Sequence, residues 1–301
     1  MLRTTFQKLT TLALIILGVS FLSCSPKLGT EMEYDFILTK SDLDHSKGTI
    51  LIIQGAAPTN VDGRIPVDAD IIYAKKSFNK NLADDLNKLG WDVVRYGKYG
   101  VYLNKIDWDK YRKTDLNFTL KQLRDVWQRV PSDKPLIVLA LSEGTLHAGH
   151  LPLQDTKALI LLGAIATNIK DVYLNKAKDD EELKKRTEKL ESAHDMKRDE
   201  MFDKSWPAGR VVDQLALNPN WTYYDKYKDL PILILHGEAD KEVDLSQTEI
   251  WKEKLPNNDI TVTTKPDGNH LFGVGNTFDT KGLAKIVNEW LGEKQVVSNK
   301  S

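Results

Sequence analysis

Short apolar runs alternate with longer segments of helical period from Met32 onward, and this alternation constrains the fold more than any other feature of the sequence. Buried strands of a parallel sheet are continuous apolar runs, and the helices that connect them cover both faces of the sheet. We therefore predict an α/β fold with a mostly parallel central sheet flanked by helices, and an antiparallel edge strand over Glu33–Leu38. The other predicted strands are Thr49–Gln54, Trp91–Tyr96, Leu136–Leu141, Ala158–Leu162, Ile232–Leu235 and Ile260–Thr264, and the predicted helices are Ser77–Leu89, Asp115–Val130, Leu245–Leu255 and Thr280–Leu291.

The charge balance argues against a nucleic-acid partner. Among 301 residues, 42 are lysine or arginine and 43 are aspartate or glutamate, so the net charge is -1. No long block of one sign supplies an electrostatic footprint for DNA, RNA or anionic lipid. The single cysteine excludes an intrachain disulfide and a cysteine cluster for zinc or iron and sulfur. We expect a fold that is stabilised by packing alone.

The first segment has the pattern of a targeting sequence. Arg3 and Lys8 precede an uncharged stretch, Leu9–Leu22, that is shorter than the about 20 residues a membrane span needs. The stretch ends beside Cys24 and resembles a bacterial lipobox. We predict a lipoprotein signal peptide over 1–23, a lipidated Cys24, a tether over 24–31, and a lipid-anchored location in the bacterial cell envelope. The alternative is an ordinary secretory signal in which the cysteine is incidental.

A charged insertion interrupts the alternation of strands and helices. Residues Lys170–Lys204 mix acidic and basic side chains with little apolar content, which indicates helix. This is either a solvated helix face or a cap over an active site, and the two are compatible. We predict one domain over 32–293 with a cap insertion at about 167–229, followed by a flexible tail over 294–301. The aromatic residues expected to line a pocket under the cap, or else to pack it onto the sheet, are Trp206, Trp221, Tyr223 and Tyr224.

A candidate nucleophile follows the predicted strand Leu136–Leu141. The sequence there reads Ala140-Leu141-Ser142-Glu143-Gly144, which is the G-x-S-x-G pattern with alanine in the first position. Such a turn places serine in a tight bend between strand and helix, so small residues are needed two positions to either side. Ser142 is therefore the predicted nucleophile.

A candidate acid and base follow later strands. Asp240 comes just after the predicted strand Ile232–Leu235, and His270 lies in a glycine-containing loop after the last strand. Asp244 competes with Asp240 for the role of acid, and either aspartate could instead cap the next helix. The order serine, acid, histidine, each just past a strand, is that of a hydrolase triad formed by Ser142, Asp240 and His270.

These residues resemble those of the α/β-hydrolase superfamily, in particular the dienelactone hydrolase-like esterases and the serine peptidase-like hydrolases. The resemblance extends over about Met32–Leu291. It implies the α/β-hydrolase fold, and it assigns the glycine-containing loop Gln54–Gly63 to the oxyanion hole. The backbone amides of Ala56 and Glu143 are the candidate donors, because main-chain donors need no particular side chain.

The chain departs from the family pattern after the strand Trp91–Tyr96. These hydrolases usually carry an aspartate and an arginine there, and this sequence has Gly97 and Tyr99 in their places. Together with Ala140, the change bears on the subfamily and the substrate. It does not involve the triad.

We therefore predict a serine hydrolase that cleaves a carboxylic ester or thioester through an acyl-enzyme on Ser142. The expected partner is a small-molecule acyl substrate, and the membrane is contacted only through the N-terminal lipid. No cofactor and no metal are expected, since no histidine and carboxylate pair has metal-ligand spacing and no phosphate loop or dinucleotide motif is present. One alternative is peptide or amide cleavage with the same triad. Another is a hydrolase-fold lipoprotein with weak or no catalysis that acts as a binding module.

Overall fold

The computed structural model describes residues 33–66 and 76–296. The chain divides into two units, Met1–Glu31 and Met32–Ser301, and every residue described below belongs to the second. The predicted signal peptide, Cys24 and the tether lie outside the described residues.

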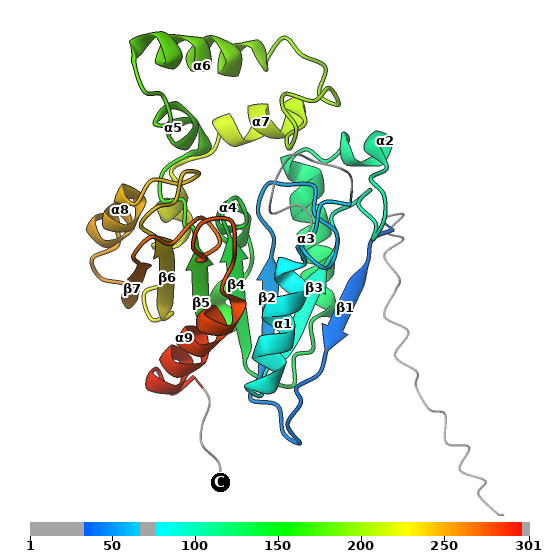
Figure 1. Ribbon diagram of the computed structural model, residues 1–301, viewed down its shortest axis with the longest axis vertical. Coiled ribbons are helices and arrows are strands. Elements are labelled where there is room, and N and C mark those ends of the chain that lie inside the picture. Colours follow the sequence, from blue (N-terminus) through cyan, green and yellow to red (C-terminus); the bar gives the residue numbers. More distant parts are fainter. Residues whose placement is uncertain (1–32, 67–75, 297–301) are drawn as a thin grey trace, which may run out of the picture. The chain divides into compact units, whose positions relative to one another are not determined.

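A seven-stranded sheet forms the centre of the described unit (Figure 1), in the order β1-β3-β2-β4-β5-β6-β7. All neighbouring strands are parallel except β1 and β3, where Phe36 pairs with Tyr96 in antiparallel register. The mostly parallel sheet and its antiparallel edge strand are therefore confirmed. The strands are β1 (Phe36–Thr39), β2 (Thr49–Ile53), β3 (Asp92–Tyr96), β4 (Leu136–Leu141), β5 (Thr156–Leu162), β6 (Ile232–Gly237) and β7 (Ile260–Lys265).

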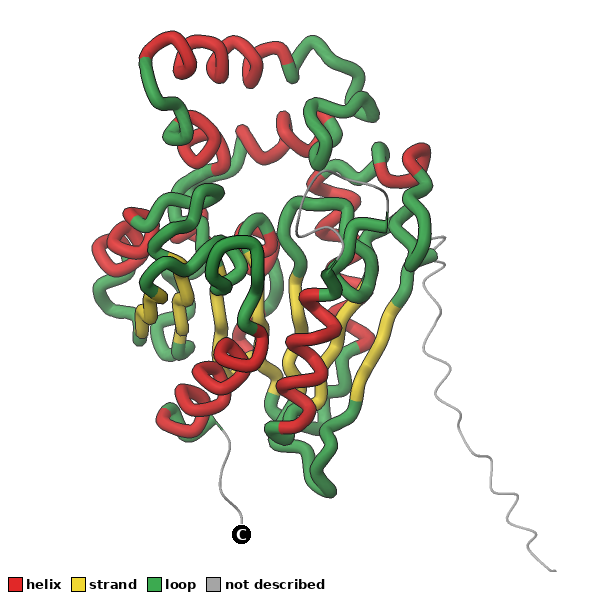
Figure 2. Tube along the Cα trace, viewed as in Figure 1, coloured by secondary structure: helices red, strands yellow, loops and turns green. Residues whose placement is uncertain are grey.

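Helices cover both faces of the sheet (Figure 2) because alternate side chains of each strand point to opposite faces. Helices α1 (Phe78–Lys88) and α9 (Thr280–Glu293) pack on one face, against side chains such as Ile50 and Ile137. Helices α3 (Leu116–Arg129) and α8 (Ser246–Lys254) pack on the other. Among the described residues, the sheet region also contains α2 (Trp108–Tyr111), α4 (Gly144–Ala148) and the 3₁₀ turn η2 (Leu153–Asp155).

The segment between β5 and β6, residues 167–229, is called the inserted segment below. It contains α5 (Ile169–Leu174), α6 (Asp180–Ser192), α7 (Ala208–Leu215) and the 3₁₀ turn η3 (Asn220–Tyr223), and Figure 1 shows α5, α6 and α7 beyond the carboxyl ends of the parallel strands. Helix α6 buries only Leu190. Its charges form ion pairs one turn apart, such as Lys185 with Glu181 at 2.5 Å. Pairs at this spacing stabilise a helix that packs little apolar surface.

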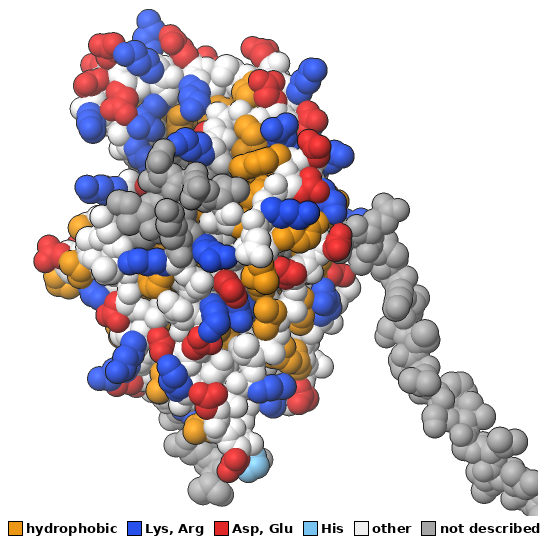
Figure 3. Space-filling model, turned by 45° about the vertical axis from the view of Figure 1, so that its right-hand side comes forward, with side chains coloured by type: hydrophobic (Ala, Val, Ile, Leu, Met, Phe, Trp, Pro, Cys, Tyr) orange, Lys and Arg blue, Asp and Glu red, His pale blue; other side chains and the backbone are white. Residues whose placement is uncertain are grey.

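Charges of both signs are interspersed on the face drawn in Figure 3. This mixture agrees with the near-neutral net charge of the sequence. None of the helices within 33–66 and 76–296 is both long and apolar enough to cross a membrane.

Candidate active site

Ser142 lies at the sharp turn between β4 and α4. Its φ of 51° is in the left-handed region, which costs a residue other than glycine on the order of 1–3 kcal/mol. Hydrogen bonds hold the turn: the Ser142 amide donates to the Leu162 carbonyl at 2.8 Å, and the Thr145 amide donates to the Ser142 carbonyl at 2.8 Å. A half-buried serine is thus presented in a strained backbone, as the sequence pattern predicts.

Two glycines allow this turn to approach β2. A Cβ at Gly144 would lie 2.7 Å from the carbonyl oxygens of Ile53 and Gln54, and one at Gly55 would lie 3.1 Å from the Cβ of Ser142. The backbone after β2 therefore comes close to the serine itself. This close approach explains why small residues follow the strand.

Asp240 and His270 form a direct pair. The Nδ1 of His270 lies 2.7 Å from the Oδ2 of Asp240, and the aspartate side chain is fully buried. Burial opposes ionisation of Asp240, but the imidazole and the backbone amides of Glu242 and Val243 lower its pKa below the usual range. An ionised aspartate accepts the Nδ1 proton, so the Nε2 of His270 carries the free lone pair.

The end of β5 contacts both Ser142 and His270. The Ser142 amide donates a hydrogen bond to the Leu162 carbonyl, and a Cβ on the next residue, Gly163, would lie 2.8 Å from the Cε1 of His270. Asp244 lies elsewhere in the loop, where its carboxylate accepts from the Ser246 amide at 2.9 Å. Of the two aspartates left open by the sequence, Asp240 is the one beside the histidine.

The loop after β2 presents a free amide near the serine. Within the described chain, neither the Ala56 nor the Glu143 amide donates a hydrogen bond to another residue. Gln54 anchors the start of the loop, because its amide group donates to the Tyr96 carbonyl and accepts from the Thr59 hydroxyl. The two predicted oxyanion donors are thus unoccupied and lie on either side of a close contact between Gly55 and Ser142.

Comparison with solved structures shows which fold this arrangement belongs to. Est1E from Butyrivibrio proteoclasticus, bound to ferulic acid, matches with a TM-score of 0.56 and 15% identity over 87% of this chain and 96% of its own. A soluble variant of monoglyceride lipase from Saccharomyces cerevisiae matches with a TM-score of 0.60 and 16% identity over 88% and 92%. Alpha/beta hydrolase domain-containing protein 10 from mouse matches with a TM-score of 0.58 and 14% identity over 88% and 96%.

The chain has the α/β-hydrolase fold. The fold expected from the sequence is therefore confirmed, although no family model and no curated protein matches the sequence. At identities of 13–16%, such neighbours establish the architecture of this chain and leave its substrate to be inferred from its own residues.

A buried ionic cluster, which the sequence did not predict, lies behind the turn that carries Ser142. Glu143 is 1% exposed, and the Nε2 of Gln214 on α7 donates to its Oε1 at 2.6 Å. Its Oε2 lies 3.7 Å from Arg210 on α7 and 4.0 Å from Lys98. Burial opposes ionisation of Glu143, yet the charges of Arg210, His147 when protonated, and Lys98 lower its pKa to about 2. The departure from the family pattern around Lys98 was the one sequence signal for this cluster.

Three of the four aromatic residues expected in the pocket pack elsewhere. Tyr224 is fully buried against the sheet, near Trp251, and its hydroxyl donates to the Thr145 carbonyl. Trp221 and Tyr223 pack on the same core. The pocket prediction is therefore wrong for these residues, because the end of the inserted segment returns along the face of the sheet before it enters β6.

Trp206 differs, since it packs over the carboxyl ends of the strands. It contacts an apolar cluster, called the cap-facing cluster below, and its indole nitrogen is buried without a hydrogen-bond partner among the described residues. The members of the cluster come from α4, the ends of β5 and β6, and α5: Leu146, Ile165, Ile169, Val172 and Val243, with Leu215 packed against them.

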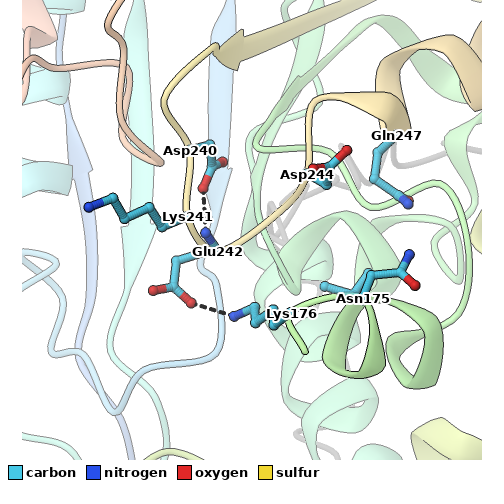
Figure 4. A pocket seen from close by; sticks show the side chains of 8 residues that line it. Asn175, Lys176, Asp240, Lys241, Glu242, Asp244 and Gln247 are labelled. Carbon is cyan, nitrogen blue, oxygen red and sulfur yellow. Dashed lines mark hydrogen bonds and ion pairs between the residues drawn. The ribbon is translucent and has the colours of Figure 1, made fainter. Parts of the chain in front are cut away.

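A polar pocket of about 220 Å³ opens beside Asp240 (Figure 4). Asn175 and Lys176, at the end of α5, face the loop that follows β6, and Lys176 pairs with Glu242 at 2.6 Å. The lining residues are Val172, Asn175, Lys176, Asp240, Lys241, Glu242, Asp244 and Gln247. The inserted segment therefore contacts the loop of the acid through charged groups. Throughout the described ranges, no group of three or more histidine, cysteine, aspartate or glutamate side chains is arranged to hold a metal ion.

Proposed function

We propose that this protein is a serine hydrolase that cleaves a carboxylic ester or thioester, with Ser142, His270 and Asp240 as its catalytic residues. The observation that carries the proposal is the 2.7 Å pair of His270 and Asp240 beside the strained turn of Ser142. A strained serine, a base and a buried acid meeting at the carboxyl ends of parallel strands are the components of acyl transfer.

In the first half of the reaction, the Ser142 hydroxyl attacks the carbonyl carbon while the Nε2 of His270 accepts its proton. The carbonyl oxygen becomes negative, and the amides of Ala56 and Glu143 donate to it. Asp240 keeps the Nδ1 proton on the imidazole and stabilises the imidazolium. The bond to the alcohol or thiol then breaks, His270 returns the proton to the leaving group, and the acyl group remains on Ser142.

Water completes the reaction. His270 takes a proton from the water as its oxygen attacks the acyl-enzyme, and the same two amides hold the second oxyanion. Collapse of that intermediate breaks the bond to the Ser142 oxygen, which regains its proton from His270, and a carboxylic acid leaves. No redox step or cofactor is needed by this sequence of proton transfers.

The cap-facing cluster supports an acyl group with apolar surface. Its members include Leu146 of α4, which follows Ser142, and Val243 of the loop that carries Asp240. Pockets that bind small molecules are mainly apolar with a few polar groups that fix orientation. The neighbours that their titles name as a monoglyceride lipase and a lipase agree with this class of substrate.

Labelling with a fluorophosphonate probe, together with hydrolysis of a panel of p-nitrophenyl esters, a thioester and an anilide, tests the proposal. Wild type should label and hydrolyse esters, and Ser142→Ala should do neither. The control is Ser192→Ala, which changes an exposed serine on α6. Equal labelling of the Ser142→Ala protein would overturn the assignment, and a preference for the anilide would move the substrate class to amides.

We further propose that Cys24 becomes the lipidated first residue of the mature protein and anchors it in a bacterial cell envelope. The lipobox-like end of the apolar stretch Leu9–Leu22 supports this. Cys24→Ser should move the protein from the membrane to the soluble fraction while its activity on a soluble ester stays the same. An unmodified Cys24 in the mass spectrum of the mature protein would contradict the anchor.

A further inference from the structure

Lys98 is held against the loop that carries one candidate oxyanion donor. Its side chain is buried, and its Nζ donates to the carbonyls of Gly55 and, at 2.8 Å, Ala56. The Gly55 carbonyl shares its peptide plane with the Ala56 amide, so the first bond sets the direction of that amide, and the second holds the next peptide of the loop. Lys98 follows β3 and points inward. Because it binds backbone carbonyls of the loop, it stabilises that loop and is not a solvent-exposed charge.

The same ammonium group faces the other candidate donor. Lys98 lies 4.0 Å from the carboxylate of Glu143, whose own backbone amide is the second donor. Glu143 sits between Ser142 and Gly144, so restraining its side chain restrains the peptide that carries the amide. One buried cation therefore connects the two halves of the oxyanion hole.

Helix α7 holds the opposite side of Glu143. Gln214 donates to Oε1 at 2.6 Å, and Arg210 lies 3.7 Å from Oε2. Arg210 is 1% exposed, and its Nε donates to the Thr114 carbonyl at 2.9 Å, which fixes the guanidinium in place. A second link runs through Tyr111, whose hydroxyl donates to the Ser205 carbonyl at 2.7 Å and lies 3.3 Å from the Ala56 carbonyl.

We propose that Lys98, Arg210 and Gln214 are positioning residues that hold both oxyanion donors, so that docking of α7 against the turn after β4 assembles the oxyanion hole. The inference rests on the proposed function of Ser142. It makes the inserted segment a part of the catalytic apparatus as well as a cover for the substrate. Burying a charged group costs free energy unless the group is paired. Several partners that bind the one carboxylate of Glu143 hold it in a single well-defined geometry.

The test measures kcat, KM and the inhibition constant of an alkyl trifluoromethyl ketone, which forms a tetrahedral oxyanion adduct with the serine. Gln214→Met removes one contact to Glu143. Lys98→Met removes a contact on the other side of Glu143 together with the two bonds to the Gly55 and Ala56 carbonyls. Removing an oxyanion donor outright costs about 100- to 1,000-fold in kcat, so displacing one should lower kcat by roughly 10- to 100-fold. The affinity for the ketone should fall in the same proportion, while KM changes by less than about threefold.

The matched control is Arg198→Met. Arg198 also joins the inserted segment to the body of the protein, through Asp115 at 3.0 Å. It pairs with Asp213 of α7 at 2.8 Å but makes no contact with Glu143. It should leave kcat and ketone affinity within about twofold of wild type. Gln214→Met removes a neutral donor and is the variant to use if Lys98→Met does not fold.

Wild-type kcat and ketone affinity in the folded Gln214→Met and Lys98→Met proteins would overturn the inference, as would a lower kcat with unchanged ketone affinity. An equal loss in the Arg198→Met protein would also overturn it, because general docking of the segment would then account for the effect. If wild type hydrolyses esters through Ser142 while these variants behave as wild type, only this inference fails. If hydrolysis does not need Ser142, the proposed function fails first.

Discussion

Gly163 lies so close to His270 that a Cβ in its place would come within 2.8 Å of the imidazole Cε1. Its φ of 59° adds a second reason for glycine, since side chains rarely adopt that conformation. The backbone at the end of β5 therefore packs directly against the imidazole, and the absence of a side chain at Gly163 allows the ring to take its position.

Gly163→Ala is expected to displace His270 and lower kcat/KM. A shift of about 1 Å in a catalytic group costs on the order of 100-fold in rate, so a loss of that size is expected. The control is Gly292→Ala on α9, where the added Cβ meets nothing within 4 Å. Steady-state hydrolysis of one p-nitrophenyl ester by both variants checks this, and an unaltered rate in Gly163→Ala would show that the ring does not depend on the glycine.

Asp240→Asn is expected to lower kcat by about 10,000-fold, because an asparagine stabilises the wrong tautomer of His270. Asp244→Asn should leave kcat nearly unchanged and change the free energy of unfolding little, because asparagine keeps an oxygen that accepts from the Ser246 amide. Ester kinetics and urea unfolding of the two variants separate the roles. The reverse order of rates would assign the acid to Asp244.

Trp206→Ala is expected to change the order of rates among esters of different acyl length, because Trp206 packs on the cap-facing cluster. Trp221→Ala is the comparison, since Trp221 packs on the sheet core. It should lower the thermal midpoint and keep the order of rates. Because each variant truncates an aromatic side chain that packs on apolar neighbours, we expect its free energy of unfolding to fall by about 3 kcal/mol. An unchanged order of rates in Trp206→Ala would place the acyl pocket elsewhere.

His147 predicts a pH dependence of stability. Burial lowers its pKa to about 4, although the nearby Glu143 favours the charged form. Between its usual pKa of 6.5 and this value, the unfolded chain binds a proton that the folded chain does not. The free energy of unfolding therefore falls as the pH falls through this window, by up to about 1.4 kcal/mol per pH unit for one group.

Urea unfolding of wild type and His147→Gln at several pH values from 4 to 8 measures this effect. The slope below pH 6.5 should decrease by the equivalent of about one proton in the variant, while above it the two slopes should agree. His45→Gln, which changes an exposed histidine, is expected to keep the wild-type slope. Equal slopes for wild type and His147→Gln would contradict the assignment.

The strands and the long helices of the sheet region were predictable from the sequence because local patterns determine them. The run Leu136–Leu141 is apolar at every position, as a strand buried on both faces must be, and α9 has Leu283 and Val287 one turn apart on a buried face. The small residues around Ser142 are also local, since they are set by the bend of a single turn. Ser142, Asp240 and His270 could be proposed because each follows a strand, and parallel strands end at one edge.

Long-range packing decided the rest. The buried charges of Lys98, Glu143 and Arg210 come from three distant segments, and their residue types alone are typical of exposed positions. Only the docking of α7 on the turn after β4 removes them from water and makes their pairing necessary. Long-range packing also decided where Tyr224 lies, because an aromatic side chain can line a pocket or fill a core equally well. The sequence by itself determined the sheet and the order of the site residues, and the tertiary structure decided which polar groups are buried together behind them.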